Sequence, residues 1–201
     1  MKKFGAVALI LLFSALVFSQ SLKTTKIKKI DSYVKSIDAL IEKNPKKFEV
    51  FADVSESEKP RWRKFKSEAA LESFRENTAE TYQIAYVWRK DNKVVGANFT
   101  LFSESGDWAH YVFYRFRPDG TLAKIEAELR TFYGNFVALQ NFYFDEKGRL
   151  LLKNIEYRNM KTDERIQPAA ESLEANRGLI NGIDYYKRVS KLPFAFLLRT
   201  H

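Results

Sequence analysis

The sequence predicts an α+β domain in which N-terminal amphipathic helices pack on a six-stranded, strongly twisted antiparallel β-meander. Two observations lead to this class. Apolar residues recur every three or four positions over residues 27–43, as they do on one face of a helix. Aromatic and β-branched residues, interrupted by polar turn clusters, dominate residues 81–157. A small β-barrel, incomplete or closed, is the alternative, because the strand pattern alone does not say whether the outer strands meet.

The first 19 residues are typical of a secretory leader. Two lysines precede an apolar run over residues 4–18, and small and polar residues follow it. The run is shorter than the roughly 20 apolar residues of a transmembrane helix. With Val17 and Ser19 as the small residues before the cleavage point, we expect a mature chain that begins at Gln20 and is exported to the periplasm or the medium of a bacterium. An uncleaved anchor is the alternative.

Residues 20–201 are expected to form one domain, because about 180 residues suffice for a single substantial core. We divide it into a helical part over about 26–77, the β-meander over about 81–158, and a C-terminal helix with an apolar tail over about 167–201. The tail is rich in aromatic and aliphatic residues, so it should dock on the body of the domain.

The two N-terminal helices have recognisable ends. Asn44 and Pro45 interrupt the helical period of residues 27–43. Ser67 can cap a second helix, which runs to Asn77. Both helices therefore precede the meander.

The strand over residues 121–131 shows the clearest alternation, with one apolar and one charged face. The hairpin before it is also readable, because Pro118 suits the second position of a type I turn and Gly120 the fourth. Neighbouring strands carry aromatic residues on both faces, so both faces of the sheet should be at least partly covered.

A weak internal repeat links three hairpins at steps of 28 residues, from Tyr86 to Tyr114 to Phe142. Equal strand lengths in a plain meander produce such a repeat without a solenoid or propeller. In a meander, the turns at Asn92, Gly120 and Gly148 should share one end of the sheet, and those at Gly106 and Gly134 the other.

Composition excludes several kinds of chemistry. The chain has no cysteine, so disulfides, thiolate metal sites and cysteine nucleophiles are excluded. Its formal net charge is +9, with lysines concentrated in the N-terminal helix among acidic residues. We interpret these charges as a solvated helix face and keep contact with an anionic surface as the alternative. We expect no nucleic-acid partner.

Few residues offer catalysis. We find no phosphate-binding loop, zinc-protease motif or nucleophile elbow, and the two histidines, His110 and His201, cannot form a multi-histidine metal site. We therefore expect neither a metal nor a cofactor. The alternative is a hydrolase-type enzyme that uses Ser103, Asp107 and His110 as nucleophile, orienting acid and base.

The favoured interpretation is a non-enzymatic envelope or secreted binding or accessory protein with an aromatic-rich sheet surface. Its partner would be an apolar or glycan small ligand or an envelope protein. We place the ligand site at the end of the sheet with the Gly106 and Gly134 turns, because aromatic residues and a few polar groups mix there. The candidate residues are Ser105, Asp107, Trp108, His110, Phe132, Tyr133 and Asn135.

Overall fold

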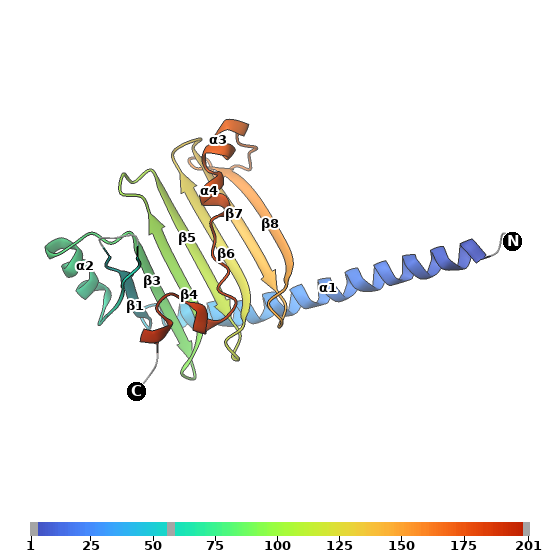
Figure 1. The fold of residues 1–201 in the computed structure, drawn as a ribbon, viewed down its shortest axis with the longest axis horizontal. Coiled ribbons are helices and arrows are strands. Elements are labelled where there is room, and N and C mark those ends of the chain that lie inside the picture. Colours follow the sequence, from blue (N-terminus) through green and yellow to red (C-terminus); the bar gives the residue numbers. More distant parts are fainter. Residues whose placement is uncertain (1–3, 56–58, 199–201) are drawn as a thin grey trace.

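The computed structural model describes the backbone of residues 4–55 and 59–198, and the side chains of that part from Leu22 onward (Figure 1). Eight strands form one antiparallel sheet in the order β2-β1-β3-β4-β5-β6-β7-β8. The strands are β1 Glu49–Asp53, β2 Trp62–Phe65, β3 Gln83–Lys90, β4 Lys93–Phe102, β5 Trp108–Phe116, β6 Leu122–Thr131, β7 Phe136–Phe144 and β8 Leu150–Asn159. The helices are α1 Phe4–Lys43, α2 Glu68–Asn77, α3 Ala170–Ala175 and α4 Arg177–Asn181, with short 3-10 turns at Val189–Lys191 and Ala195–Leu197.

The α+β class with an antiparallel sheet is confirmed, and the expectations for the number of strands and for the packing of the second helix are corrected. The strand count is wrong, because β1 and β2 lie inside the part of the chain that we expected to be helical, about 26–77. The strand β1 is buried on both faces at Val50, Phe51 and Ala52, so its short apolar run carries no alternation to reveal it. The sheet is also not closed, since β2 and β8 are its two edges.

The helix α1 crosses one face of the sheet near the ends of its strands. Its Ile30 and Val34 pack on Ala123 of β6 and Tyr143 of β7. Our expectation for the second helix is corrected, because α2 packs chiefly on the two additional strands. Within the part of the chain whose side chains are described, no helix is long and apolar enough to cross a membrane.

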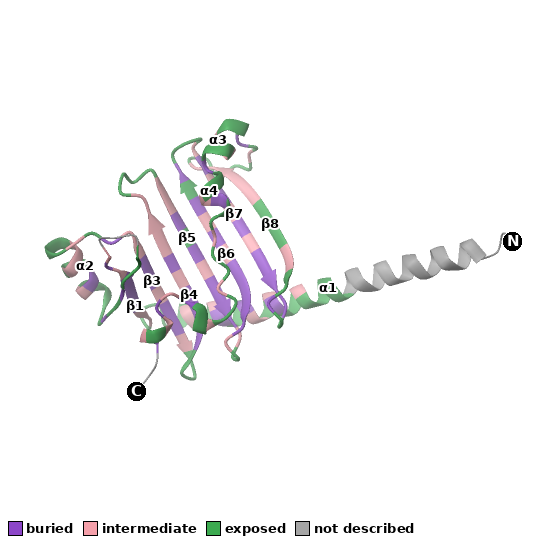
Figure 2. Ribbon diagram, viewed as in Figure 1, coloured by how far each residue is buried: buried purple, intermediate pink, exposed green. Residues whose placement is uncertain are grey.

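The opposite face is covered by the C-terminal segment, residues 183–198. Figure 1 shows this segment in front of the sheet and α1 behind it. Phe194 is fully buried and stacks on Phe51, with ring centroids 4.5 Å apart, and it also contacts Trp62 at 5.0 Å. At the other end of this face, Ile180 of α4 packs with Leu129 and its neighbours. Burial is accordingly most extensive along β6 and β7 and least along β8 (Figure 2).

The 28-residue repeat corresponds to three successive hairpins of a single meander. The turns at Asn92, Gly120 and Gly148 lie at one end of the sheet, and those at Gly106 and Gly134 at the other (Figure 1). The pairing register shifts at Trp88/Arg89, Arg115/Phe116 and Tyr143/Phe144, the same place in each hairpin. The repeat therefore arises because the three hairpins share the same bulge and the same turn geometry.

Candidate functional site

The two turns of the predicted site lie side by side. The Phe132 N–H donates to the Asp107 carbonyl oxygen at 3.0 Å, and Trp108 pairs with Thr131. The side chains of Phe132 and Tyr133 are 67% and 57% exposed. The Asn176 side chain, which follows α3, donates to the Tyr133 carbonyl oxygen at 3.0 Å. This end of the sheet therefore presents two aromatic side chains beside α3.

The polar residues of the predicted site point to different places. Ser105 Oγ donates to Asp107 Oδ2 at 2.6 Å, and both residues are exposed. His110 is buried, and its Nε2 has no hydrogen-bond partner in the described part of the chain. Burial lowers the pKa of His110 to about 4. No described hydrogen bond or ion pair joins His110 to Ser103 or Asp107. Asn135 holds its turn with a positive φ of 52°.

A second candidate surface lies on the sheet face that α1 crosses, in the part of that face that the helix leaves uncovered. Strand register aligns Asn98, Phe113, Glu126 and Asn141 in one row across β4–β7, with Asn154 of β8 continuing it. Tyr111, Glu128, Leu139 and Glu156 form the next row. Two hollows of about 320 and 720 Å³ follow these rows and share Leu139 and Asn141. We call them together the sheet trough; its far side is formed by Arg158, Arg165, Ile166 and Gln167.

The sheet trough combines aromatic side chains with polar side chains, and the charges of its carboxylates are balanced by ion pairs. Each of its three carboxylates is paired with at least one cation. Glu126 pairs with Arg115 and Lys124, Glu128 with Arg130, and Glu156 with Arg158 and Arg165. The pKa of Glu156 is lowered, first by the hydrogen bond from Arg165 and then by that from Arg158. In contrast, the buried Asn98 Oδ1 has no hydrogen-bond partner in the described part. Tyr111, Phe113 and the amide side chains are thus uncharged groups that line the trough.

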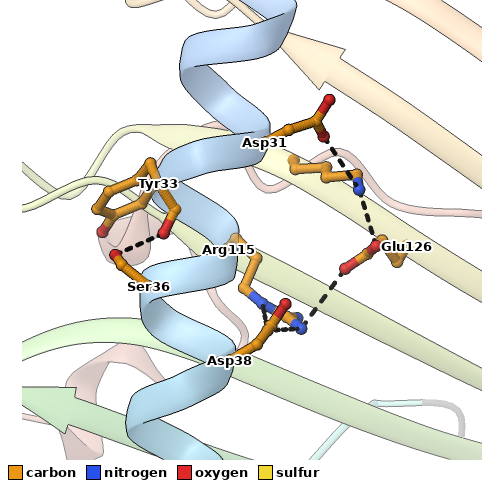
Figure 3. Close-up of polar contacts among 7 residues, drawn as sticks. Asp31, Tyr33, Ser36, Asp38, Arg115 and Glu126 are labelled. Atoms are coloured by element: carbon orange, nitrogen blue, oxygen red, sulfur yellow. Dashed lines mark hydrogen bonds and ion pairs between the residues drawn. The ribbon is translucent and has the colours of Figure 1, made fainter.

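A network of ion pairs holds α1 against the edge of the sheet trough (Figure 3). Asp38 of α1 accepts from Arg115 of β5, and Arg115 also lies 3.5 Å from Glu126. Lys124 of β6 links Glu126 at 2.8 Å to Asp31 of α1 at 3.6 Å. Lys124 and Arg115 are buried, so these contacts compensate for their lost hydration. The network positions α1 and so sets one wall of the trough.

Sequence reasoning did not find the sheet trough. Its residues come from five strands and the segment after β8, and no local motif marks them. In the sequence, the aromatic residues on both faces of the strands were the feature that could have indicated the trough. Among the described residues, no group of three or more acidic or histidine side chains is placed to hold a metal ion.

Comparison with protein-family models, with curated proteins and with solved structures finds no match for this chain.

Proposed function

We propose that this protein is an exported, non-enzymatic binding protein that holds an oligosaccharide in the sheet trough. The observation that carries the proposal is the uncovered face of β4–β8, where Tyr111 is 38% exposed among amide and carboxylate side chains. Binding sites of this kind combine apolar walls with a few oriented polar groups. Residues 1–19 support export, since their pattern is typical of a cleavable leader.

A sugar fits the chemistry of the trough better than an apolar ligand does. A pyranose ring has an apolar C–H face that can lie on Tyr111, and hydroxyls that can pair with amides such as Asn98 and Asn141. The carboxylates are already paired with cations, which favours a neutral ligand. Four interstrand spacings from β4 to β8 amount to about 19 Å, the length of a short oligosaccharide.

A binding assay with a matched pair of tyrosines tests the proposal. Neutral oligosaccharides from bacterial envelopes and secreted polysaccharides are screened on an array, and the best binder is measured by calorimetry. Tyr111→Ala should weaken binding about tenfold or more, as expected for an aromatic anchor, without changing the melting temperature. Tyr185 is 39% exposed on the opposite face, where it packs on Phe142 and Phe144, so Tyr185→Ala is the control for aromatic loss.

Two further variants probe the polar half of the site. Asn98→Ala and Asn141→Ala should each reduce affinity, because they remove the amides that would meet sugar hydroxyls. The proposal is wrong if no oligosaccharide binds, if Tyr111→Ala binds the ligand as tightly as the unaltered protein, or if Tyr111→Ala and Tyr185→Ala lose affinity equally.

The hydrolase alternative has no comparable observation in its favour. Catalysis by a triad needs its hydroxyl, imidazole and carboxylate within hydrogen-bond reach. The described side-chain hydrogen bonds of Ser103 and Asp107 involve Ser105 and Trp108 rather than His110.

A further inference from the structure

The C-terminal segment ties together the three turns at one end of the sheet. The Lys187 carbonyl oxygen accepts from the Leu122 N–H at 3.0 Å, and the Val189 N–H donates to the Gly120 carbonyl oxygen at 3.0 Å. Further along, the Leu198 carbonyl oxygen accepts from Arg89 Nη2 at 2.8 Å. The segment and the turns therefore form one continuous surface at this end.

This surface carries a cluster of cations that form no ion pair with any residue in the described part of the chain. Lys93 and Arg188 line a groove of about 770 Å³, and Lys26 and Lys29 of α1 line a smaller hollow beside Pro118 and Glu146. Lys187 lies over the Gly148 turn. We call these residues, with Lys147, the basic end. None of the six has a carboxylate within 4.0 Å in the described part of the chain.

The carboxylates at the basic end are fewer, and two are already engaged in their own turns. Asp119 accepts from the backbone and hydroxyl of Thr121, and the buried Asp145 accepts from Arg149 and from the Lys147 N–H. Asp91 and Glu146 remain exposed. The basic end is therefore electropositive, which attracts anions over about a Debye length.

An exposed aromatic side chain accompanies these cations. Phe196 is 62% exposed and lines the same groove as Lys93 and Arg188. A solvated polyanion gains little from such a side chain. A lipid surface gains from both features, because apolar side chains bury at the headgroup boundary while nearby lysines and arginines meet anionic headgroups.

We infer that the basic end docks on an anionic phospholipid membrane surface, with Phe196 entering the headgroup layer. Charge complementarity and the exposed Phe196 together single out this partner. The sheet trough lies on the part of the sheet beyond α1, away from the Gly120 turn, so docking leaves it open to its ligand. The inference does not depend on what the trough binds.

Vesicle binding by the full chain tests the inference. Partitioning is measured on vesicles of phosphatidylglycerol with phosphatidylcholine and on phosphatidylcholine alone, and the readout is the ratio of the two affinities. Residues 1–19 are the same in every variant, so their apolar contribution cancels in comparisons between variants. Lys187→Glu with Arg188→Glu should lower the ratio about thirtyfold or more, since each cation near a lipid surface contributes a factor of about five.

The control reverses the same number of charges at the other end of the sheet. Lys161 follows β8, and Arg177 belongs to α4; both are exposed. Lys161→Glu with Arg177→Glu should leave the ratio unchanged within about twofold, because these positions lie beyond the Debye length from the docked surface. Equal losses in the two double variants would show that net charge alone is responsible and would overturn the inference.

A third variant separates a membrane from a soluble polyanion. Phe196→Ser should weaken binding to the anionic vesicles but leave binding to soluble polyphosphate unchanged, because only the lipid surface accepts an apolar side chain. The inference is also overturned if the charge-reversed basic end binds vesicles normally, or if the protein binds polyphosphate while ignoring anionic vesicles.

Discussion

Arg115 of β5 and Asp38 of α1 form a hydrogen-bonded ion pair in which Nε of the guanidinium lies 3.0 Å from Asp38 Oδ1. The same guanidinium carbon lies 3.2 Å from the centre of the Phe113 ring. One side chain thus joins the helix, the sheet and an aromatic residue of the trough. The pair adds a directional contact to the apolar packing of Ile30, Val34 and Ile37, and so helps to set the position of the helix on the strands.

Removal of Asp38 tests how strongly this pair holds α1. Asp38→Asn leaves the buried Arg115 with Glu126, at 3.5 Å, as its one anionic neighbour among the described residues. We expect a loss of about 2 kcal/mol in the free energy of unfolding, measured by urea denaturation, because a charged hydrogen-bond partner is removed. Glu42→Gln, an exposed change on the same helix, should cost less than about 0.5 kcal/mol. Equal effects would mean that the pair does not hold the helix.

The pH dependence of stability should report the buried His110. Burial lowers its pKa from 6.5 to about 4, so the unfolded chain binds more protons between these values. The stabilisation is fully present above pH 6.5 and is lost as the pH falls toward 4. This loss of stability amounts to about 3 kcal/mol at pH 4, relative to neutral pH.

A variant isolates this contribution from that of the carboxylates. His110→Leu lacks the titrating group, so the stability difference between it and the unaltered protein should shift by that amount between pH 7 and pH 4, in favour of the variant. Carboxylate titrations common to both proteins cancel in this difference. A constant difference across the range would contradict a neutral, buried His110.

Two phenylalanines of the C-terminal segment should respond differently to truncation. Phe194 is fully buried between Phe51 and Trp62, so Phe194→Ala should cost about 3–5 kcal/mol in unfolding free energy. Phe196 is 62% exposed, and Phe196→Ala should cost less than about 0.5 kcal/mol. Thermal denaturation of both variants measures the contrast. Similar melting temperatures would mean that the segment is not part of the core.

Glycine-to-alanine changes at the two turns of the first predicted site should also differ. Both glycines have positive φ, 76° at Gly106 and 89° at Gly134, which costs an alanine about 1–2 kcal/mol. At Gly134, a Cβ would also lie 2.6 Å from the Cβ of Ser172 in α3, whereas at Gly106 it would meet open space. Gly134→Ala should therefore be the more destabilising by about 1–3 kcal/mol. Chemical denaturation of the two variants decides the order.

The expected leader is tested by the mass of the exported protein. Expression with residues 1–19 in a bacterial host should give extracytoplasmic protein whose intact mass starts at Gln20, allowing for cyclisation of its amine. The same chain recovered with residues 1–19 still attached would contradict cleavage.

The sequence by itself determined those features that depend on neighbours along the chain. Alternation in β6 and the glycine of the Gly120 turn predict a hairpin, and the structure places β5 and β6 as adjacent antiparallel strands. The helical period of residues 27–43 likewise lies within α1. Local backbone geometry and a one-sided apolar pattern are sufficient for such predictions.

Only the tertiary structure decided which surfaces remain uncovered. Tyr111 and Tyr114 belong to the same strand and look alike in the sequence, yet Tyr111 is 38% exposed and Tyr114 is 3% exposed. The difference arises because the C-terminal segment covers the face of Tyr114, whereas α1 crosses the other face without reaching Tyr111. The strand β1 was missed for the same reason, since burial on both faces removes alternation. Coverage of a sheet depends on segments far away in the chain, and the pattern within one strand does not record where they dock.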